Sequence, residues 1–210
     1  MMDKVFKPSE MEEKIYKMWE EGGYFTPKID LSKKPFTIIL PPPNASGKMH
    51  VGNIFMIALE DLMIRWHRMR GEPSLYVPGT DHAGFETQIT FERALKKEGK
   101  SRFQFDRNTL YQEIQKFVLN NQQLVNTQIR RLGASVDWSR YRFTLDPQVL
   151  ETVFNTFKKM YEDGLVYRSS YLVNYCPVCG TTFADLEVLH EERVDPLYYI
   201  WLNDSNRRIE

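Results

Sequence analysis

Two short segments of the sequence combine polar side chains with glycines, and each follows a predicted strand. The first segment reads Pro-Pro-Pro-Asn-Ala-Ser-Gly-Lys-Met-His-Val-Gly-Asn over residues 41–53. His50 and Asn53 are three residues apart at a predicted helix start, so both side chains can face one ligand. The first turn of a helix offers N–H groups and the positive end of its dipole to an anion. Gly52, which has no Cβ, permits a flat or bulky group of the ligand to approach the backbone closely. The segment predicts a phosphate and adenine site; the alternative is a helix that merely begins with a histidine.

The second segment reads Pro-Gly-Thr-Asp-His-Ala-Gly over residues 78–84. A carboxylate at the end of a strand, such as that of Asp81, suits the ammonium group of an amino acid through a charge-assisted hydrogen bond. The flanking glycines allow the chain to turn tightly around it. Without further information, a helix cap at Asp81 and a structural histidine at 82 are the more usual interpretation.

The surrounding pattern predicts a βαβ unit that positions both segments. Residues 36–40 form an apolar run that reads as a buried strand and ends at three prolines, which cannot continue a ladder. A helix follows and stops at Gly71, and residues 74–77 predict a second strand. Apolar residues recur at helical spacing in that helix: Val51, Ile54, Phe55, Ala58, Leu59, Leu62 and Trp66. The two strands of such a unit are parallel, and ligands bind beyond their carboxyl ends. Both polar segments are therefore expected side by side.

Further helices are expected over residues 86–98, 106–132 and 147–163, and strands over 172–175 and 197–202. Between these strands lie the only two cysteines, Cys176 and Cys179, spaced as half of a zinc site. Tetrahedral zinc needs four ligands, and His190 is the one nearby further candidate. Structural thiols without a metal are a second interpretation, and a redox pair is a third.

Composition narrows the class of protein. The 210 residues are 42% hydrophobic, which is enough for a globular core. Basic and acidic side chains balance at 28 each, so no large RNA-binding face is indicated, although Arg65, Arg68 and Arg70 could contact RNA. No apolar run is long enough to span a membrane, no signal peptide is evident, and two cysteines make no disulfide framework. A cytoplasmic protein without a membrane partner is expected.

The sequence resembles class I aminoacyl-tRNA synthetases in four segments. That family carries a His-Ile-Gly-His signature after its first Rossmann strand, and this chain has His-Val-Gly-Asn at 50–53. Valyl enzymes carry a proline run followed by asparagine, as at 41–44, and the sequence Gly-Thr-Asp-His-Ala-Gly, as at 79–84. Residues 131–144 and 172–200 are similar to further stretches of the valyl enzymes, the latter up to the first strand of their editing domain. Two departures are Asn53 in the signature and Phe85-Glu86, where small apolar residues are more usual.

The resemblance implies an α/β fold: the first half of a Rossmann-type parallel-sheet catalytic domain, followed by the start of an inserted editing and zinc region. It implies an amino-terminal helical segment over 1–34, the Rossmann half over 35–168 and the insertion over 169–210. The implied activity is that of a valine–tRNA ligase, in which ATP with Mg²⁺ activates valine before transfer to tRNA(Val).

The resemblance also implies a role for individual residues. His50 and Asn53 would stabilise the phosphates of ATP, Gly52 would lie against the adenosine, and Asp81 would hold the valine ammonium. The amino acid site would be lined by Pro41, Pro42 and Asn44. The zinc expected at Cys176 and Cys179 rests on the spacing of the two cysteines and not on this resemblance.

Other functions stay open at the level of sequence. The family's Lys-Met-Ser-Lys-Ser loop and anticodon-binding region are missing, so a partial catalytic unit with weak or no activity by itself is expected, with most tRNA contacts elsewhere. One alternative is a non-catalytic or split synthetase-like module that binds ATP, tRNA or a partner. Another is a class I synthetase of the isoleucyl or leucyl group.

Overall fold

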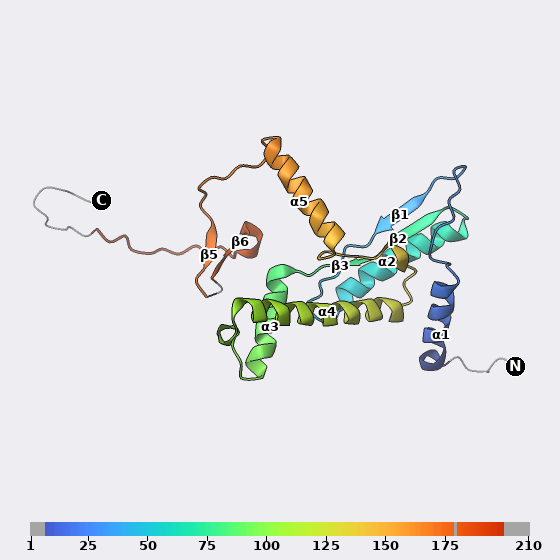
Figure 1. The fold of residues 1–210 in the computed structure, drawn as a ribbon, viewed down its shortest axis with the longest axis horizontal. Coiled ribbons are helices and arrows are strands. Elements are labelled where there is room, and N and C mark those ends of the chain that lie inside the picture. Colours follow the sequence, from blue (N-terminus) through green and yellow to red (C-terminus); the bar gives the residue numbers. More distant parts are fainter. Residues whose placement is uncertain (1–6, 179, 200–210) are drawn as a thin grey trace, which may run out of the picture. The chain divides into compact units, whose positions relative to one another are not determined.

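The structure is a computed structural model that describes residues 7–178 and 180–199, and the chain divides into two compact units, 1–160 and 161–210 (Figure 1). The elements of the first unit are α1 (Pro8–Glu21), β1 (Phe36–Ile39), α2 (Val51–Met69), β2 (Ser74–Val77), β3 (Gly79–Thr80), α3 (Gly84–Lys97), α4 (Arg107–Arg131) and β4 (Arg142–Phe143). Helix α5 (Pro147–Glu162) runs across the boundary. The expected limits at residues 34 and 168 stay predictions.

The predicted βαβ unit is confirmed. Strands β1 and β2 pair in parallel, with Phe36 opposite Ser74 and Ile39 opposite Val77, and α2 connects them. The Leu40 N–H donates to the Val77 carbonyl at 3.0 Å, which carries the pairing one residue past β1. The two strands therefore deliver residues 41–50 and 78–84 to the same edge, as the parallel arrangement requires.

A second parallel pair extends this edge. Strand β3 lies beside β4, with Gly79 opposite Arg142 and Thr80 opposite Phe143. A Cβ at Gly79 would lie 3.0 Å from the Arg142 carbonyl oxygen, so glycine lets the two backbones approach. Strand β4 thereby brings a segment about sixty residues further along the chain next to the Asp81 segment.

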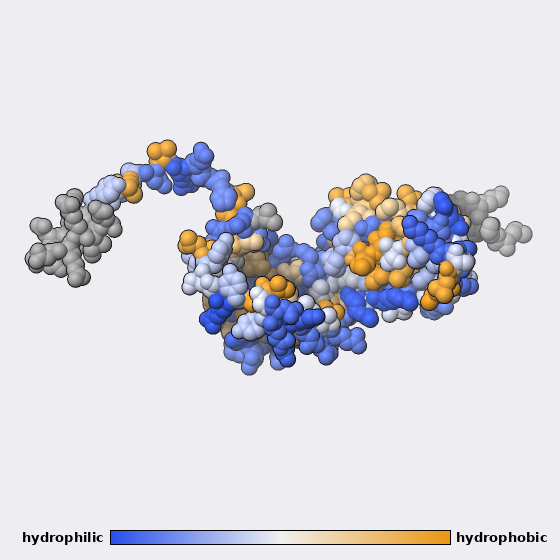
Figure 2. Space-filling model, turned by 90° about the horizontal axis from the view of Figure 1, so that it is seen from above, coloured by the Kyte–Doolittle hydropathy of each residue, from blue (hydrophilic) through white to orange (hydrophobic). Residues whose placement is uncertain are grey.

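Helix α2 buries a different face from the one that its apolar stripe suggests. The buried residues of its inner face are Ile57, Asp61 and Ile64, and the two isoleucines pack with Leu40, Tyr76 and the α4 residues Val125 and Ile129. Most of the stripe is exposed: Val51, Phe55, Leu59, Leu62 and Trp66 expose 81%, 65%, 46%, 64% and 48% of their area. On the face seen in Figure 2, apolar side chains gather over the end of this unit that holds β1, β2 and α2.

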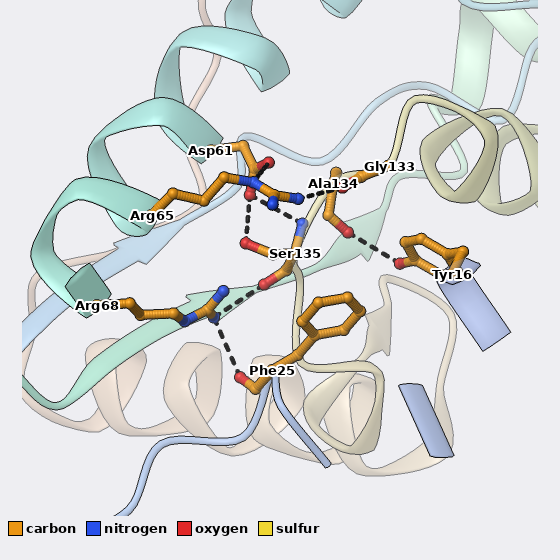
Figure 3. A network of polar contacts seen from close by, with 8 residues as sticks. All are labelled: Tyr16, Phe25, Asp61, Arg65, Arg68, Gly133, Ala134 and Ser135. Carbon is orange, nitrogen blue, oxygen red and sulfur yellow. Dashed lines mark hydrogen bonds and ion pairs between the residues drawn. The ribbon is translucent and has the colours of Figure 1, made fainter. Parts of the chain in front are cut away.

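A polar network joins α2 to residues 133–135, which in turn contact Tyr16 of α1 (Figure 3). Asp61 accepts hydrogen bonds from the Ser135 N–H at 2.8 Å, from the Ser135 hydroxyl and from Arg65 Nε at 2.6 Å. The Arg65 and Arg68 guanidinium groups also donate to backbone carbonyls, at Gly133 and Ser135 respectively. Both arginines thus contribute to the packing of this unit, and RNA contact by them stays a prediction.

Tyr16 extends the network into α1. Its hydroxyl donates to the Ala134 carbonyl at 2.8 Å and accepts from Trp138 Nε1 at 2.7 Å. Burial raises the pKa of this hydroxyl to about 12, because a phenolate would lose its hydration there. Helix α1 is consequently bound to the loop that leads from α4 to β4.

The second unit contains an antiparallel hairpin of β5 (Asn174–Cys176) and β6 (Thr181–Phe183). The strand expected over 172–175 begins two residues later, and residues 197–199 form no strand, while 200–202 lie outside the described residues. Within the described part of the chain, every helix is too short or too polar to cross a membrane.

Candidate active site

A backbone bridge joins the two polar segments. Asp81 N–H donates to the Pro43 carbonyl at 2.9 Å, and Ala45 N–H donates to the Asp81 carbonyl at 2.6 Å, which makes Asn44 and Asp81 neighbours in a parallel bridge. Pro43 and Ala45 are buried, whereas Asn44 is exposed. The proline run therefore places Asn44 beside Asp81, as its sequence position predicts.

Thr144, the residue after β4, organises the Asp81 segment. Its hydroxyl donates to Asp81 Oδ1 at 3.0 Å and contacts both the backbone N–H and the ring Nδ1 of His82, at 2.9 and 2.6 Å. Side chains of Asp81 and His82 are 35% and 38% exposed, so both can reach a ligand. The carbonyl of His82 accepts from the Thr87 hydroxyl at 2.6 Å, which ties the segment to α3.

Asn44 is oriented by a second carboxylate. Its Nδ2 donates to Glu86 Oε2 at 2.6 Å, across from the first turn of α3. Because a carboxylate only accepts hydrogen bonds, the amide nitrogen must face Glu86 and the amide oxygen must face away. Pro41 and Pro42 are exposed on the same loop. The residues expected to line an amino acid site thus share one loop, and Glu86 joins them.

His50 caps α2 with its own ring. His50 Nδ1 accepts from the N–H groups of Gly52 at 3.1 Å and Asn53 at 3.4 Å, while Asn53 Oδ1 accepts from the His50 N–H at 3.3 Å. The ring of His50 thus accepts from the same N–H groups that the sequence assigns to an anion, and anion binding here stays a prediction. A Cβ at Gly52 would lie 2.9 Å from the ring Cε1 of His50, so the glycine makes room for the histidine itself.

This capping fixes the donor that His50 can offer. Nδ1 accepts hydrogen bonds, so in the neutral ring the proton is on Nε2, and Nε2–H can donate to a phosphate oxygen. The Met49 N–H donates to Gln128 Oε1 at 3.0 Å, which anchors the start of the helix to α4. The hydrogen-bond donor that this helix start can offer a ligand is thus a side chain.

Three residues of this arrangement were not identified as site residues from the sequence: Thr144, Glu86 and Gln128. Thr144 lies in a stretch to which the sequence assigns no chemistry, and it reaches Asp81 only through the pairing of β3 with β4. Glu86 is visible in the sequence only as a departure from the usual small residue. No sequence signal identifies Gln128, which is one of several polar residues on a long helix.

The zinc site predicted from the sequence would lie in the second unit. Cys176 lies on β5, and the Gly180 N–H donates to its carbonyl at 2.8 Å, while Cys179 falls outside the described residues. In residues 7–178 and 180–199 no cluster of three or more His, Cys, Asp or Glu side chains could hold a metal ion. The described side chains do not complete the four ligands of a zinc site. Zinc at Cys176 and Cys179 stays a prediction.

Comparison with protein families identifies a match across most of the chain. Residues 14–200 match the model described as tRNA synthetases class I (I, L, M and V). This stretch includes both polar segments, the Thr144 region and the β5–β6 hairpin.

Curated relatives agree with this match. A valine–tRNA ligase of Dehalococcoides mccartyi is 44% identical over 199 residues, which cover 95% of this chain and 23% of the relative. The chloroplastic/mitochondrial valine–tRNA ligase 2 of Arabidopsis thaliana is 45% identical over 189 residues, covering 90% of this chain and 19% of the relative. The chain spans only about a quarter of the length of the first of these relatives.

A solved structure shares the fold. A chain of the LeuRS–tRNA–LeuAMS ternary complex of Agrobacterium radiobacter K84 agnB2 superposes with a TM-score of 0.72 over 88% of this chain and 22% of that chain. The two sequences are 22% identical, so the likeness establishes the Rossmann-type architecture alone.

Proposed function

The chain belongs to the class I tRNA synthetases of the isoleucine, leucine, methionine and valine group, and from this premise we propose that it forms the amino acid and ATP half-site of a valine–tRNA ligase. The observation that carries the proposal is the Asn44–Asp81 bridge, which places an amide and a carboxylate together beyond the strand ends. The valine–tRNA ligases at 44% and 45% identity support valine over the other three amino acids. A cytoplasmic location is part of the same proposal.

In the proposed reaction a carboxylate oxygen of valine attacks the α-phosphorus of ATP. The new O–P bond forms as the bond from the α-phosphorus to the bridging oxygen breaks, and pyrophosphate leaves with the electron pair. Valyl-adenylate remains, and its aminoacyl group passes to the terminal ribose of tRNA(Val). Mg²⁺ accompanies ATP as part of the substrate. The protein contributes positioning and charge stabilisation, which are large effects in phosphoryl chemistry.

Each proposed role follows from an atom that the geometry leaves available. His50 Nε2–H donates to the phosphates, because Nδ1 is engaged in the helix cap. Asp81 accepts from the valine ammonium, and Asn44 offers its amide oxygen, because its nitrogen is bound to Glu86. Asn53 acts through His50, since its side chain holds the His50 backbone. Pro41 and Pro42 line the amino acid site, and Gly52, in the first turn of α2, leaves room for the His50 ring.

The test is valine-dependent exchange of pyrophosphate into ATP by this chain. We expect His50→Ala to lower the exchange rate by about 100-fold, since one lost transition-state donor has effects of that size. Tyr111→Ala, which removes an exposed ring on α4 that has no proposed role, is the control and should keep the full rate.

Competition by isoleucine and threonine in the same assay measures selectivity, because one methylene is worth only about 1–3 kcal/mol in such a pocket. Saturable binding of ATP and valine without exchange would instead favour a binding module. A chain that binds neither compound would overturn the proposal.

A further inference from the structure

The Thr144 hydroxyl is the shared hydrogen-bond partner of two candidate ligand-binding side chains that lie over sixty residues earlier in the sequence. It contacts Asp81 Oδ1, the His82 N–H and His82 Nδ1, at 3.0, 2.9 and 2.6 Å. Backbone hydrogen bonds alone already hold β4 beside β3, because the Arg142 N–H donates to the Pro78 carbonyl and the Thr144 N–H donates to the Thr80 carbonyl. The hydroxyl contacts are therefore additional to what the fold of β4 requires.

The valences of these groups determine where each proton lies. A hydroxyl has one proton to donate and two lone pairs to accept. The Asp81 carboxylate can only accept, so the Thr144 proton points to Oδ1. The His82 backbone N–H can only donate, which takes one lone pair, and the second lone pair then accepts a proton from the ring. Neutral His82 consequently carries its proton on Nδ1, which also lies 3.3 Å from Asp81 Oδ1.

This arrangement leaves two acceptors of the segment open. In the part of the chain that the structure describes, Asp81 Oδ2 and His82 Nε2 have no hydrogen-bond partner. A carboxylate oxygen and an imidazole nitrogen together suit a group with several N–H donors and a positive charge. The primary ammonium group of an amino acid has both properties.

We propose that Thr144 is a positioning residue that holds the Asp81 carboxylate and fixes the tautomer of His82, so that Asp81 Oδ2 and His82 Nε2 together bind the substrate ammonium. The assignment of an amino acid as the ligand rests on the proposed function. The hydrogen-bond arrangement rests on the described contacts alone. His82 is thereby a second ammonium-binding residue next to Asp81.

Two substitutions separate the hydroxyl from the strand that carries it. Thr144→Val keeps the β-branched shape and the pairing of β4 but removes the hydroxyl, and Thr144→Ser keeps the hydroxyl. Nitrogen NMR of the ring of His82 reports the tautomer directly. We expect Nδ1–H in the parent chain and in Thr144→Ser, and a shift toward Nε2–H in Thr144→Val.

Kinetics supply the second readout. In pyrophosphate exchange, Thr144→Val should raise the KM for valine by about tenfold, the effect of one hydrogen bond to a charged group. The KM for ATP should stay within about twofold, because the phosphates are bound at the other segment, and Thr144→Ser should restore the KM for valine. An equal loss for both substrates would indicate a general structural role and would overturn the inference.

The outcomes distinguish this inference from the proposed function. A parent chain with the Nδ1–H tautomer but no valine-dependent exchange would refute the function and retain the positioning role of Thr144. A parent chain with the Nε2–H tautomer would overturn the inference whatever its activity, and this result does not depend on whether Thr144→Val folds.

Discussion

The two segments that carry the candidate chemistry differ in what holds them in place: one depends on contacts between residues close in sequence, and the other on contacts between residues far apart in sequence. The His50–Asn53 segment is organised mainly by itself, through hydrogen bonds between residues two and three positions apart. The Asp81–His82 segment is organised by Pro43 and Ala45, almost forty residues earlier, and by Thr144, which is 63 residues from Asp81. The first segment should therefore survive changes elsewhere in the unit, whereas the second should depend on the whole of it.

The largest expected effect comes from the core beneath the Asp81 segment. Phe143 is 4% exposed and packs with Ala45 and Val118, so it supports both the β3–β4 pair and the loop after β1. Phe143→Ala should cost about 3–4 kcal/mol of the free energy of unfolding, because a buried aromatic ring leaves a cavity. Urea unfolding measures the loss.

The control is Phe103→Ala, whose ring is 83% exposed and which should change stability by less than about 0.5 kcal/mol. Backbone NMR of the Phe143 variant should show changed shifts at Asp81 and His82 and unchanged shifts at Gly52 and Asn53. Equal disturbance of both segments would show that the comparison is wrong.

A smaller effect is expected from pH, through the loop that leads to β4. Tyr16 has a pKa of about 12 in the folded chain against 10.0 as its ordinary value, because it is buried against Ala134. Above pH 10 the unfolded chain loses this proton before the folded chain does, so stability falls as pH rises toward 12. We expect a loss of about 1 kcal/mol between pH 9 and pH 11.

Tyr16→Phe isolates this contribution, since the variant has no hydroxyl to ionise at that position. The difference in unfolding free energy between the parent chain and the variant should shrink over the same pH range. A difference that stays constant would mean that the Tyr16 hydroxyl ionises alike in both states.

The smallest effect is expected at the self-organised segment. Asn53→Ala removes the side chain that accepts from the His50 N–H and should cost about 0.5–1 kcal/mol, at the low end for a helix cap because the bond is long and exposed. Asn53→Asp keeps an acceptor and is the control. Amide hydrogen exchange should rise only over the first turn of α2, and faster exchange at Asp81 would contradict the local character of the cap.

Local features of the chain were predictable because they depend on neighbours in sequence. The βαβ unit follows from an apolar run, a proline stop, a helical period and a second run, and β1, α2 and β2 are found within a few residues of the predicted bounds. Glycine at position 52 and histidine at 50 also predict a special helix start. What the pattern could not supply was that the ring of His50 itself accepts hydrogen bonds from the N–H groups of Gly52 and Asn53.

The apolar stripe of α2 shows that helical periodicity does not predict which side of a helix is buried when apolar residues occur on two sides. A helix with apolar residues on two sides gives no sequence rule for which side meets the strands, and the structure buries Ile57, Asp61 and Ile64. A charged residue is on the buried side because Ser135 and Arg65 satisfy its carboxylate. Neither partner can be inferred from the helix sequence.

The sequence by itself determined the family, the βαβ order and the residue types at the strand ends, because motifs, periodicity and turn residues act over a few positions. Only the tertiary structure decided that Thr144 holds Asp81 and His82, that Glu86 orients Asn44 and that most of the stripe of α2 is exposed. These contacts join residues 42 to 63 positions apart or depend on which face is covered. Pairing of that range is set by the packing of the whole unit, and no local pattern encodes it.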